Sequence, residues 1–281
     1  MTKTLAKYNE GNGSFSFHHS ISESGTFSSV FGPESHQQFE ILYLLKGDIT
    51  YHIEGEKYVV NQGDAIFVPP NQIHTIHLNT KVDYERIVVL FDIEIVEKML
   101  ALCDMSLDKE VFNDTTCYRV IPHAMLDKAG IIEQINGFLQ VQNQKLAQMY
   151  MLASIFKLII KLDAVLSTKE RGYVPVSVDS VVKGATAYIN KNIQNTLTLD
   201  EICSAVFVSK STLCHKFVKI MHVSVKRYVA IKKIHYASRL IKRGMSAVEA
   251  GVAVGYKQYT TFYHNYKQIL GVSPAEDKRI D

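Results

Sequence analysis

No run of consecutive apolar residues in this chain is longer than five, as in the run from Ile87 to Phe91. A helix that crosses a membrane needs about 20 such residues, so the sequence predicts a protein without membrane spans. Residues 1–19 are polar and lack the apolar core of a secretory signal. We therefore expect a cytoplasmic protein with no membrane partner.

Cysteine is also scarce. The four cysteines show no C-x-x-C spacing and lie at Cys103, Cys117, Cys203 and Cys214. A chain of 281 residues can bury an adequate core without disulfides, so we interpret all four as free thiols. Nucleophile–base arrangements, phosphate-cradling glycine loops and nucleotide fingerprints are missing too, and no catalytic residue is assigned.

The composition, with 47% hydrophobic and 21% charged residues, is that of an ordinary globular protein. The length indicates two domains, because a domain has about 150 residues. Residues 1–176 contain 15 Lys and Arg against 21 Asp and Glu (net −6), whereas residues 177–281 contain 16 against 7 (net +9). A compact basic domain is expected of a protein that binds a polyanion. The alternative is a basic face that is merely solvated, and net charge alone does not separate the two.

The basic half contains two similar helical units. In the first, Thr198 and Glu201 have the spacing of a capping box before a helix with apolar residues on one face. A second helix is predicted to start at Ser209, with Leu213 and Phe217 facing inward. This unit therefore reads as a helix, a tight turn and a helix.

The second unit repeats this layout 49 residues further along the chain. Its first helix is expected to bury three valines, Val248, Val252 and Val254. Phe262 and Tyr266 then repeat the inward pair of the first unit. Between the units, residues 228–241 have apolar side chains at helical period and Gly244 follows as a stop. One long helix is therefore predicted to join the two units.

The end of the second unit carries the most specific pattern in the chain. It consists of Val254-Gly255-Tyr256, Phe262, Tyr266-Lys267 and Gly271-Val272-Ser273-Pro274. This pattern resembles the closing signature of the DNA-binding domain of the AraC/XylS family of bacterial transcription regulators, and the similarity covers residues 181–274. The resemblance implies two helix-turn-helix units that bind double-stranded DNA.

Three positions depart from the family pattern. His222 stands where the first unit usually turns on glycine, and Gly251 replaces the usual alanine in the first helix of the second unit. Asp277 falls where a closing Tyr-Arg would begin. We expect a weak helix around Gly251, because glycine costs about 1 kcal/mol relative to alanine in a helix, and a loosely ended last helix.

In a helix-turn-helix the second helix enters the major groove, where its outward residues meet base edges and flanking cations contact phosphates. This geometry selects the following DNA-binding residues: Lys210, Ser211, Cys214, His215 and Lys219 in the first unit, and Lys257, Tyr259, Thr260, Tyr263, His264 and Lys267 in the second. The alternative for Tyr259 and Tyr263 is packing on neighbouring helices. His215 and His264 stand where the family most often has arginine. They either read base edges as neutral groups or tighten binding as the pH falls.

The acidic half contains short β-rich runs separated by turn residues. The six predicted strands cover residues 39–45, 49–54, 57–60, 65–68, 75–78 and 84–91. Short strands at this spacing predict an all-β barrel or sandwich.

Two spaced motifs occur among these strands: His36, Glu40 and Gly47, then Gly63, Pro69 and His74. They resemble the two cupin motifs, and the sugar-sensing branch of the AraC/XylS family carries a cupin-like barrel that binds an effector. The resemblance implies that His36, Glu40 and His74 line an effector pocket. Five further residues could join them: His18, His19, Tyr43, Tyr51 and His77. A cupin metal centre would add Glu34 in place of its first histidine. Regulators of this type usually keep the motif without a metal, so neither metal nor cofactor is assigned.

Helical apolar spacing marks residues 93–103 and 130–166. The second segment carries a wide apolar stripe: Leu146, Met149, Tyr150, Ala153, Phe156, Ile159 and Ile160. Such a stripe must be buried against the barrel, which is the default, or against a second chain. A homodimer would pair two DNA-binding domains with two half-sites.

We therefore predict an α+β multidomain fold with four parts: a cupin-like effector-sensing barrel (1–92), a helical dimerisation segment (93–166), a linker (167–177) and an all-α AraC-type DNA-binding domain with two helix-turn-helix units (178–281). The predicted function is a sequence-specific transcription activator that responds to a small-molecule effector such as a sugar. Homodimerisation is predicted, and RNA polymerase is a further expected partner. One alternative is a metal-dependent cupin enzyme with a basic DNA-binding appendage. The other is a ligand-free regulator controlled only by its abundance.

Overall fold

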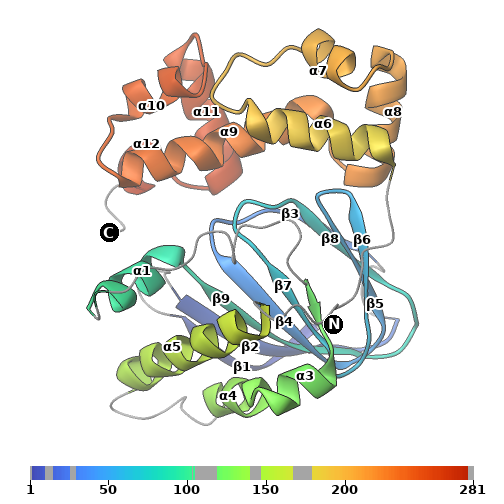
Figure 1. The fold of residues 1–281 in the computed structure, drawn as a ribbon, viewed down its shortest axis with the longest axis vertical. Coiled ribbons are helices and arrows are strands. Elements are labelled where there is room, and N and C mark those ends of the chain that lie inside the picture. The colour runs from blue at the N-terminus through green and yellow to red at the C-terminus, as the bar shows by residue number, and fades with distance from the viewer. Residues whose placement is uncertain are drawn as a thin grey trace. The chain divides into compact units, whose positions relative to one another are not determined.

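The structure is a computed structural model that describes residues 2–9, 15–25, 30–102, 104, 119–139, 147–166 and 179–277. The chain divides into two compact units, with the main division between Val176 and Ser177. The first unit is rich in strands and the second is helical, as Figure 1 shows. The predicted linker, 167–177, lies outside the described residues.

The N-terminal unit contains ten described strands: β1 (Thr2–Asn9), β2 (Phe15–Ser22), β3 (Val30–Glu34), β4 (Phe39–Lys46), β5 (Ile49–Ile53), β6 (Glu56–Val60), β7 (Ala65–Val68), β8 (His74–Leu78), β9 (Tyr84–Phe91) and β10 (Val120–Ile121). They form a six-stranded sheet in the order β1-β2-β9-β4-β7-β10 and a four-stranded sheet in the order β3-β8-β5-β6. The six predicted strands are confirmed as β4 to β9. Sequence reasoning missed β1, β2, β3 and β10.

The larger sheet is buried on both faces, which explains the continuous apolar runs of its central strands. Along β4, Ile41 and Tyr43 belong to one core cluster, whereas Leu42 and Leu44 belong to another. This alternation follows from the two-residue period of a strand. The first cluster lies between the sheet and the helices, and the second lies between the two sheets.

Four described helices belong to this unit: α1 (Ile93–Ala101), α3 (His123–Lys128), α4 (Ile131–Phe138) and α5 (Ala147–Leu166). Helices α4 and α5 lie against each other beside the larger sheet (Figure 1). Helix α3 was not predicted. Its cap at Pro122 has no side-chain hydrogen bond, so the polar start signal of a helix is missing there.

The structure buries only part of the predicted apolar stripe of α5 in the core: Ile159 is 2% exposed and Phe156 packs against the core cluster, while Leu146 lies outside the described residues. The face that packs into the core carries Met151, Ile155, Leu158 and Leu162. Three other residues of the stripe are exposed in the single chain: Met149 at 68%, Tyr150 at 42% and Ile160 at 55%. This helix has apolar residues around most of its circumference, so its period could not select the buried face.

The C-terminal unit consists of seven helices among the described residues: α6 (Ser180–Lys191), α7 (Leu199–Ala205), α8 (Lys210–Met221), α9 (Val225–Lys242), α10 (Ala247–Ala253), α11 (Tyr259–Leu270) and α12 (Pro274–Asp277). Helices α7 and α8 form the first predicted helical unit and α10 and α11 the second, while α9 is the predicted connecting helix. The Lys233 ammonium of α9 donates to the carbonyls of Asn195 and Val254 at 2.9 and 2.6 Å. One buried side chain of the connecting helix thus ties α9 to a residue just before α7 and to the turn after α10.

The inner face predicted for α10 is partly wrong. Val254 is fully buried, but Val248 and Val252 are 58% and 67% exposed. The helix instead packs through Ala250 and Gly251. A side chain at Gly251 would bring its Cβ to 3.1 Å from the ring of Phe262. The glycine is therefore explained by close packing against that ring.

Candidate functional site

Helix α8 presents a polar face outward. Ser209 caps it, since its side chain accepts a hydrogen bond from the Thr212 amide, as predicted. Leu213 and Phe217 are fully buried, which confirms the predicted inward face. The residues predicted to contact DNA lie on the other side: Lys210, Ser211, His215 and Lys219 are exposed and Cys214 is half-buried.

Helix α11 repeats this arrangement. Phe262 and Tyr266 are fully buried, in the same role as the inward pair of α8. Of the residues predicted to contact DNA, the following are exposed: Lys257, Tyr259, Thr260, His264 and Lys267. Tyr263 is half-buried, with its ring centre 6.3 Å from that of Tyr259. The two tyrosines thus contact each other and still reach the surface.

The lysines on and beside these two helices differ in whether they form ion pairs. Lys210 forms an exposed ion pair of 2.8 Å with Asp200 of α7, and this hydrogen bond raises the pKa of the lysine. Among the described residues, no ion pair involves Lys219, Lys257 or Lys267. These three ammonium groups are therefore available to an external anion.

The first helix of each unit begins with the same device. Thr198 and Glu201 form a reciprocal capping box at α7, as predicted. Ser246 and Glu249 form the same box at α10. Sequence reasoning missed the second box, although the Ser-x-x-Glu spacing is visible in the sequence. The repeated cap is a second sign that the two units are copies of one design.

Two departures from the family pattern have a local explanation. His222 ends α8 in the left-handed conformation, with φ of 57°, which is the conformation that glycine would adopt most easily there. The last helix, which was expected to end loosely, reaches the final described residue, Asp277. Asp277 is buried, and its Oδ2 accepts hydrogen bonds from the hydroxyls of Ser238 and Tyr266. The carboxylate therefore anchors α12 to α9 and α11.

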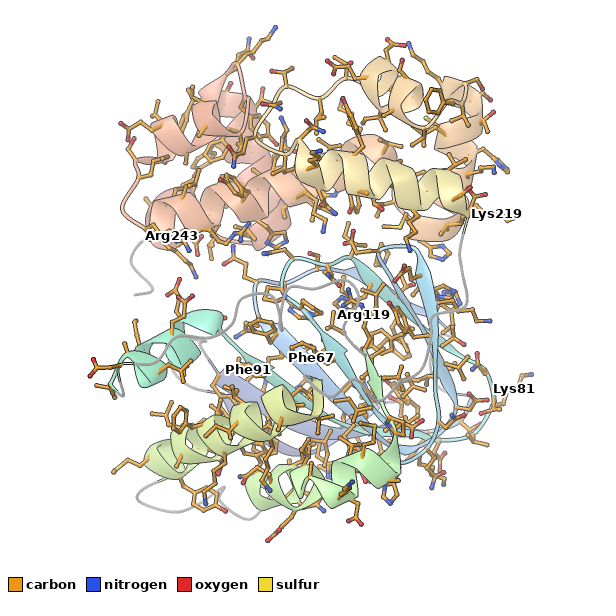
Figure 2. The ribbon with its side chains drawn as sticks, in the orientation of Figure 1. Phe67, Lys81, Phe91, Arg119, Lys219 and Arg243 are labelled. Carbon is orange, nitrogen blue, oxygen red and sulfur yellow. The ribbon has the colours of Figure 1, made fainter. Side chains whose placement is uncertain are left out.

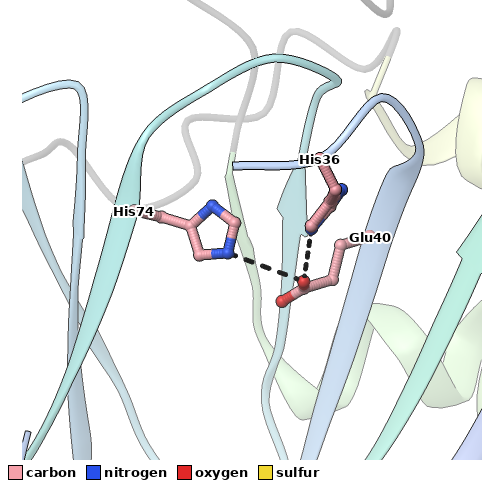
Figure 3. Close-up of side chains that lie close together, drawn as sticks. All are labelled: His36, Glu40 and His74. Atoms are coloured by element: carbon pink, nitrogen blue, oxygen red, sulfur yellow. Dashed lines mark hydrogen bonds and ion pairs between the residues drawn. The ribbon is translucent and has the colours of Figure 1, made fainter. Parts of the chain in front are cut away.

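The predicted effector residues come together in the N-terminal unit (Figure 3). His36 Nε2 lies 2.9 Å from Glu40 Oε2, and His74 Nε2 lies 3.8 Å from the same oxygen. The Tyr51 hydroxyl donates to the other oxygen, Oε1, at 2.6 Å. Glu34 is exposed on β3 and does not belong to this group, so the cupin-like set of four is wrong in that member.

Burial alone would raise the pKa of Glu40, but its neighbours reverse that effect. The hydrogen bond from His36, the charges of His74 and His36, and the hydrogen bond from Tyr51 together lower the pKa to about 2. The carboxylate is therefore ionised at neutral pH. It is 6% exposed, and a buried charge requires a compensating partner.

The hydrogen bonds of the two imidazoles limit which group can balance the charge of the Glu40 carboxylate. His36 Nδ1 faces the Gln38 carbonyl at 2.8 Å and His74 Nδ1 faces the Gln72 carbonyl at 3.0 Å. A carbonyl only accepts, so both Nδ1 atoms carry hydrogen and both Nε2 atoms are directed at Glu40. Either a second proton on His36 or a shared divalent cation then balances the carboxylate. The three ligand atoms lie within 4.8 Å of one another, and two imidazoles with a carboxylate are a donor set for transition metals.

The other residues considered for this site are spread over the unit. Tyr51 joins the group through its hydroxyl. His19 pairs with Glu85 at 2.7 Å, and Tyr43 belongs to the core cluster on the helix side of the sheet. His77 packs its ring against His52, with ring centres 4.6 Å apart. Burial, with the charge of Arg86, lowers the pKa of His18, and the charge of Glu40 opposes this shift, so His18 lies within electrostatic reach of the group.

No helix among the described residues is long and apolar enough to cross a membrane. Cys203 and Cys214 are free thiols, as predicted, while Cys103 and Cys117 lie outside the described residues.

Comparison with known proteins gives matches to both units. Residues 21–147 match the model of an AraC-like ligand binding domain, and residues 202–280 match that of a helix-turn-helix domain. The melibiose operon regulatory protein of Escherichia coli (strain K12) is 21% identical over 269 residues, covering 87% of this chain and 82% of that protein. The lactose operon transcription activator of Staphylococcus xylosus is 23% identical over 246 residues, covering 85% and 83%. Among solved structures, an apo variant of ToxT from Vibrio cholerae matches over 97% of this chain and 98% of that chain, with 12% identity and a TM-score of 0.42.

The two matched models correspond in order to the strand-rich unit and the helical unit. Relatives that align over most of both chains are operon regulators. This evidence excludes the alternative of a cupin enzyme, because the family and the relatives act on transcription. Over both units the chain is thus similar to AraC-type transcription regulators, with an N-terminal unit that matches an AraC-like ligand binding domain and a C-terminal unit that matches a helix-turn-helix domain.

Proposed function

We propose that this chain is a cytoplasmic, sugar-responsive transcription activator that binds DNA through the outward faces of α8 and α11. The observation that carries this proposal is the equivalence of the two helices. Each buries a pair of residues four positions apart, Leu213 with Phe217 and Phe262 with Tyr266, and exposes at least one lysine, hydroxyl-bearing residues and one histidine. Two such helices on one domain fit two successive segments of major groove.

The experiment is capture of genomic DNA fragments by the purified full-length chain at two salt concentrations. Lys219→Ala and Lys267→Ala are expected to weaken binding to all sequences and to lower the salt slope by about 1 each, because each lysine contacts one phosphate. Lys191→Ala is the matched control, since it removes an exposed charge from α6 of the same domain. If all three variants behave alike, net charge rather than this surface governs binding.

Base recognition is tested with His264→Ala and Tyr259→Ala. Each is expected to cost about 1–3 kcal/mol on the preferred motif and to relax the sequence preference at one position. If the captured DNA fragments share no sequence motif and binding depends only on the salt concentration, sequence-specific regulation is contradicted. Repeating the capture at mildly acid and mildly alkaline pH separates the two roles proposed for His215 and His264. If the DNA affinity is the same at both pH values, the two histidines contact base edges in their neutral form.

Homodimerisation through α5 is part of this proposal. Its outward face carries Met149, Ala153 and Ile160, so an apolar stripe is left uncovered in a single chain. Ile160→Glu is expected to shift the sedimentation equilibrium toward monomer. Val82→Glu, at an exposed apolar residue elsewhere in the same unit, is expected to leave it unchanged. Monomer alone at micromolar concentration, with and without DNA, would contradict the dimer.

The effector is proposed to bind at His36, Glu40 and His74. Two relatives named for sugar operons support a saccharide, and a cluster of polar groups beside an apolar interior suits a small polar ligand. A binding saccharide should raise the unfolding midpoint of the wild-type chain but not of Glu40→Gln. His123→Ala, an exposed histidine of the same unit, is the control. If no saccharide shifts the midpoint, regulation by abundance alone is favoured.

A further inference from the structure

Arg119 is a buried cation that spans the two sheets of the N-terminal unit. Only 4% of its surface is exposed. Its backbone carbonyl accepts a hydrogen bond of 2.7 Å from the Phe67 amide of β7, in the larger sheet. Its guanidinium lies 5.9 Å from the ring centre of Tyr58 in β6, in the smaller sheet. The side chain, labelled in Figure 2, therefore reaches from one sheet toward the other.

The guanidinium is not satisfied by the described part of the chain. Nε and NH1 are buried, and neither has a hydrogen-bond partner among the described residues. Arginine stays protonated at physiological pH, with five N–H donors and no acceptor. A ring 5.9 Å away stands at the outer limit of a cation–π contact, which is about 6 Å. A permanent charge buried in this way opposes folding unless something else compensates it.

Arg86 shows how the same unit satisfies an arginine. It is half-buried, and its NH1 donates to Ser22 Oγ at 2.9 Å and to the Tyr84 carbonyl at 3.5 Å. Its guanidinium carbon lies 4.3 Å from the ring centre of Tyr84. The missing hydrogen bonds of the Arg119 guanidinium are therefore a feature of that position and not of every arginine in the unit. Arg86 serves as a matched control.

Arg119 and the effector residues border the same interior. Tyr58 and Tyr51 both belong to the core cluster that lies between the two sheets. The Tyr51 hydroxyl donates to Glu40 at 2.6 Å. This aromatic and otherwise apolar core cluster is thus bordered by an anionic carboxylate with its histidines and by a guanidinium whose Nε and NH1 have no hydrogen-bond partner among the described residues. Such an interior suits a ligand with hydroxyl groups and one acidic group.

We propose that the effector carries an anionic group, a carboxylate or a phosphate, which Arg119 binds between the two sheets. The planar guanidinium matches the oxygens of both groups, and charge-assisted hydrogen bonds to them are strong. This inference rests on the proposed effector-sensing function and narrows the ligand from sugars in general to sugar acids and sugar phosphates. The anionic group of the ligand would accept hydrogen bonds from Nε and NH1 of Arg119, which have no partner among the described residues.

The first test measures the stability of the ligand-free, full-length chain in a buffer whose only anion is chloride. Arg119→Met keeps an unbranched side chain of similar length but removes the uncompensated charge. Its unfolding midpoint is expected to rise by about 2–4 °C, the change typical of a modest stabilisation in a domain of this size. Arg86→Met is expected to lower the midpoint, because it loses real contacts. A fall for Arg119→Met as well would overturn the proposal, since the chain itself would then satisfy Arg119.

The second test titrates inorganic phosphate and acetate, with chloride at equal ionic strength as reference. A saturable rise of the midpoint is expected in the wild type and in Arg86→Met, but not in Arg119→Met. A rise with phosphate alone assigns a phosphate ligand, and a rise with acetate alone assigns a carboxylate. Equal rises in wild type and Arg119→Met, or no rise in the wild type with either anion, would overturn the proposal.

DNA capture separates this inference from the proposed function. Arg119→Met is expected to retain the DNA motif of the wild type, because the substitution lies in the ligand-binding unit. If the wild type captures a motif and neither anion binds, only the anionic ligand is refuted. If the wild type captures no motif at all, the proposed function fails whatever the anions do.

Discussion

Removal of the Asp277 carboxylate should destabilise the C-terminal unit more than its place at the end of the described chain suggests. The carboxylate is 6% exposed and accepts from the hydroxyls of Ser238 and Tyr266, which are themselves fully buried. Burial, followed by the hydrogen bond to Asp277, raises the pKa of Tyr266. The phenol therefore remains a proton donor throughout the working pH range.

The expected magnitude follows from what Asp277→Ala leaves behind. Two buried hydroxyls lose their acceptor, and an unsatisfied buried polar group costs about 1–3 kcal/mol. The sum is about 2–6 kcal/mol. Helix α12 has only four residues, so it can move aside and admit water to both hydroxyls. We therefore expect the lower part of the range, about 2–3 kcal/mol.

Scanning calorimetry of the full-length chain is the assay, and the transition of the C-terminal unit should fall by about 10 °C or more. Ser238→Ala/Tyr266→Phe/Asp277→Leu is the matched control, because removing all three polar groups leaves nothing unsatisfied. The triple variant should recover most of the lost stability. An Asp277→Ala chain that unfolds within about 2 °C of the wild type would refute the anchoring role.

Three further predictions concern single positions. His222→Gly should stabilise the C-terminal unit by up to about 1 kcal/mol in urea unfolding, because glycine adopts the left-handed conformation without strain; a loss of stability would contradict this. Gly251→Ala should lower the unfolding midpoint despite alanine's better helix propensity, since its Cβ would meet the buried ring of Phe262 at 3.1 Å; a higher midpoint would mean that the ring can yield. Burial, and then the charge of Arg86, depress the pKa of His18, so its neutral form favours the folded state above the unfolded pKa of about 6.5 and this stability is lost as the pH falls. His18→Gln should therefore flatten the fall in midpoint between neutral and mildly acid pH, and an unchanged pH profile would count against it.

The parts of the fold that could be predicted are those in which local signals and tertiary packing agree. Helices α7 and α8 have polar caps at Thr198 and Ser209 and a single apolar face. Strands β4 to β9 combine apolar runs with turn residues between them. Strands β1 and β2 were missed because half of their residues are polar or small, and they gain their structure from pairing with each other and with β9.

The candidate site, like the fold, could be predicted only in part from the sequence. The spacing of His36, Glu40 and His74 identified three groups that the structure brings together, because each is tied to a turn or a strand end of the same sheets. Glu34 lies on an exposed strand, and no spacing rule reveals the direction of its side chain. Arg119 stands outside every motif. Its significance arises only from the absence of partners around it among the described residues, which is a property of the folded interior.

On both α5 and α10 the apolar pattern did not identify which residues the core buries, and the physical reason is the same. A periodic apolar pattern shows that a helix has a face to bury, but it cannot rank two apolar faces on the same helix. In α10 the smaller residues Ala250 and Gly251 face the core, because Phe262 occupies the space that a valine would need. In α5 the apolar residues outnumber the core positions, so Met149 and Ile160 stay at the surface. An excess of apolar residues opposite a filled core costs solubility unless another surface covers it, and in the proposed homodimer that surface is a second copy of α5.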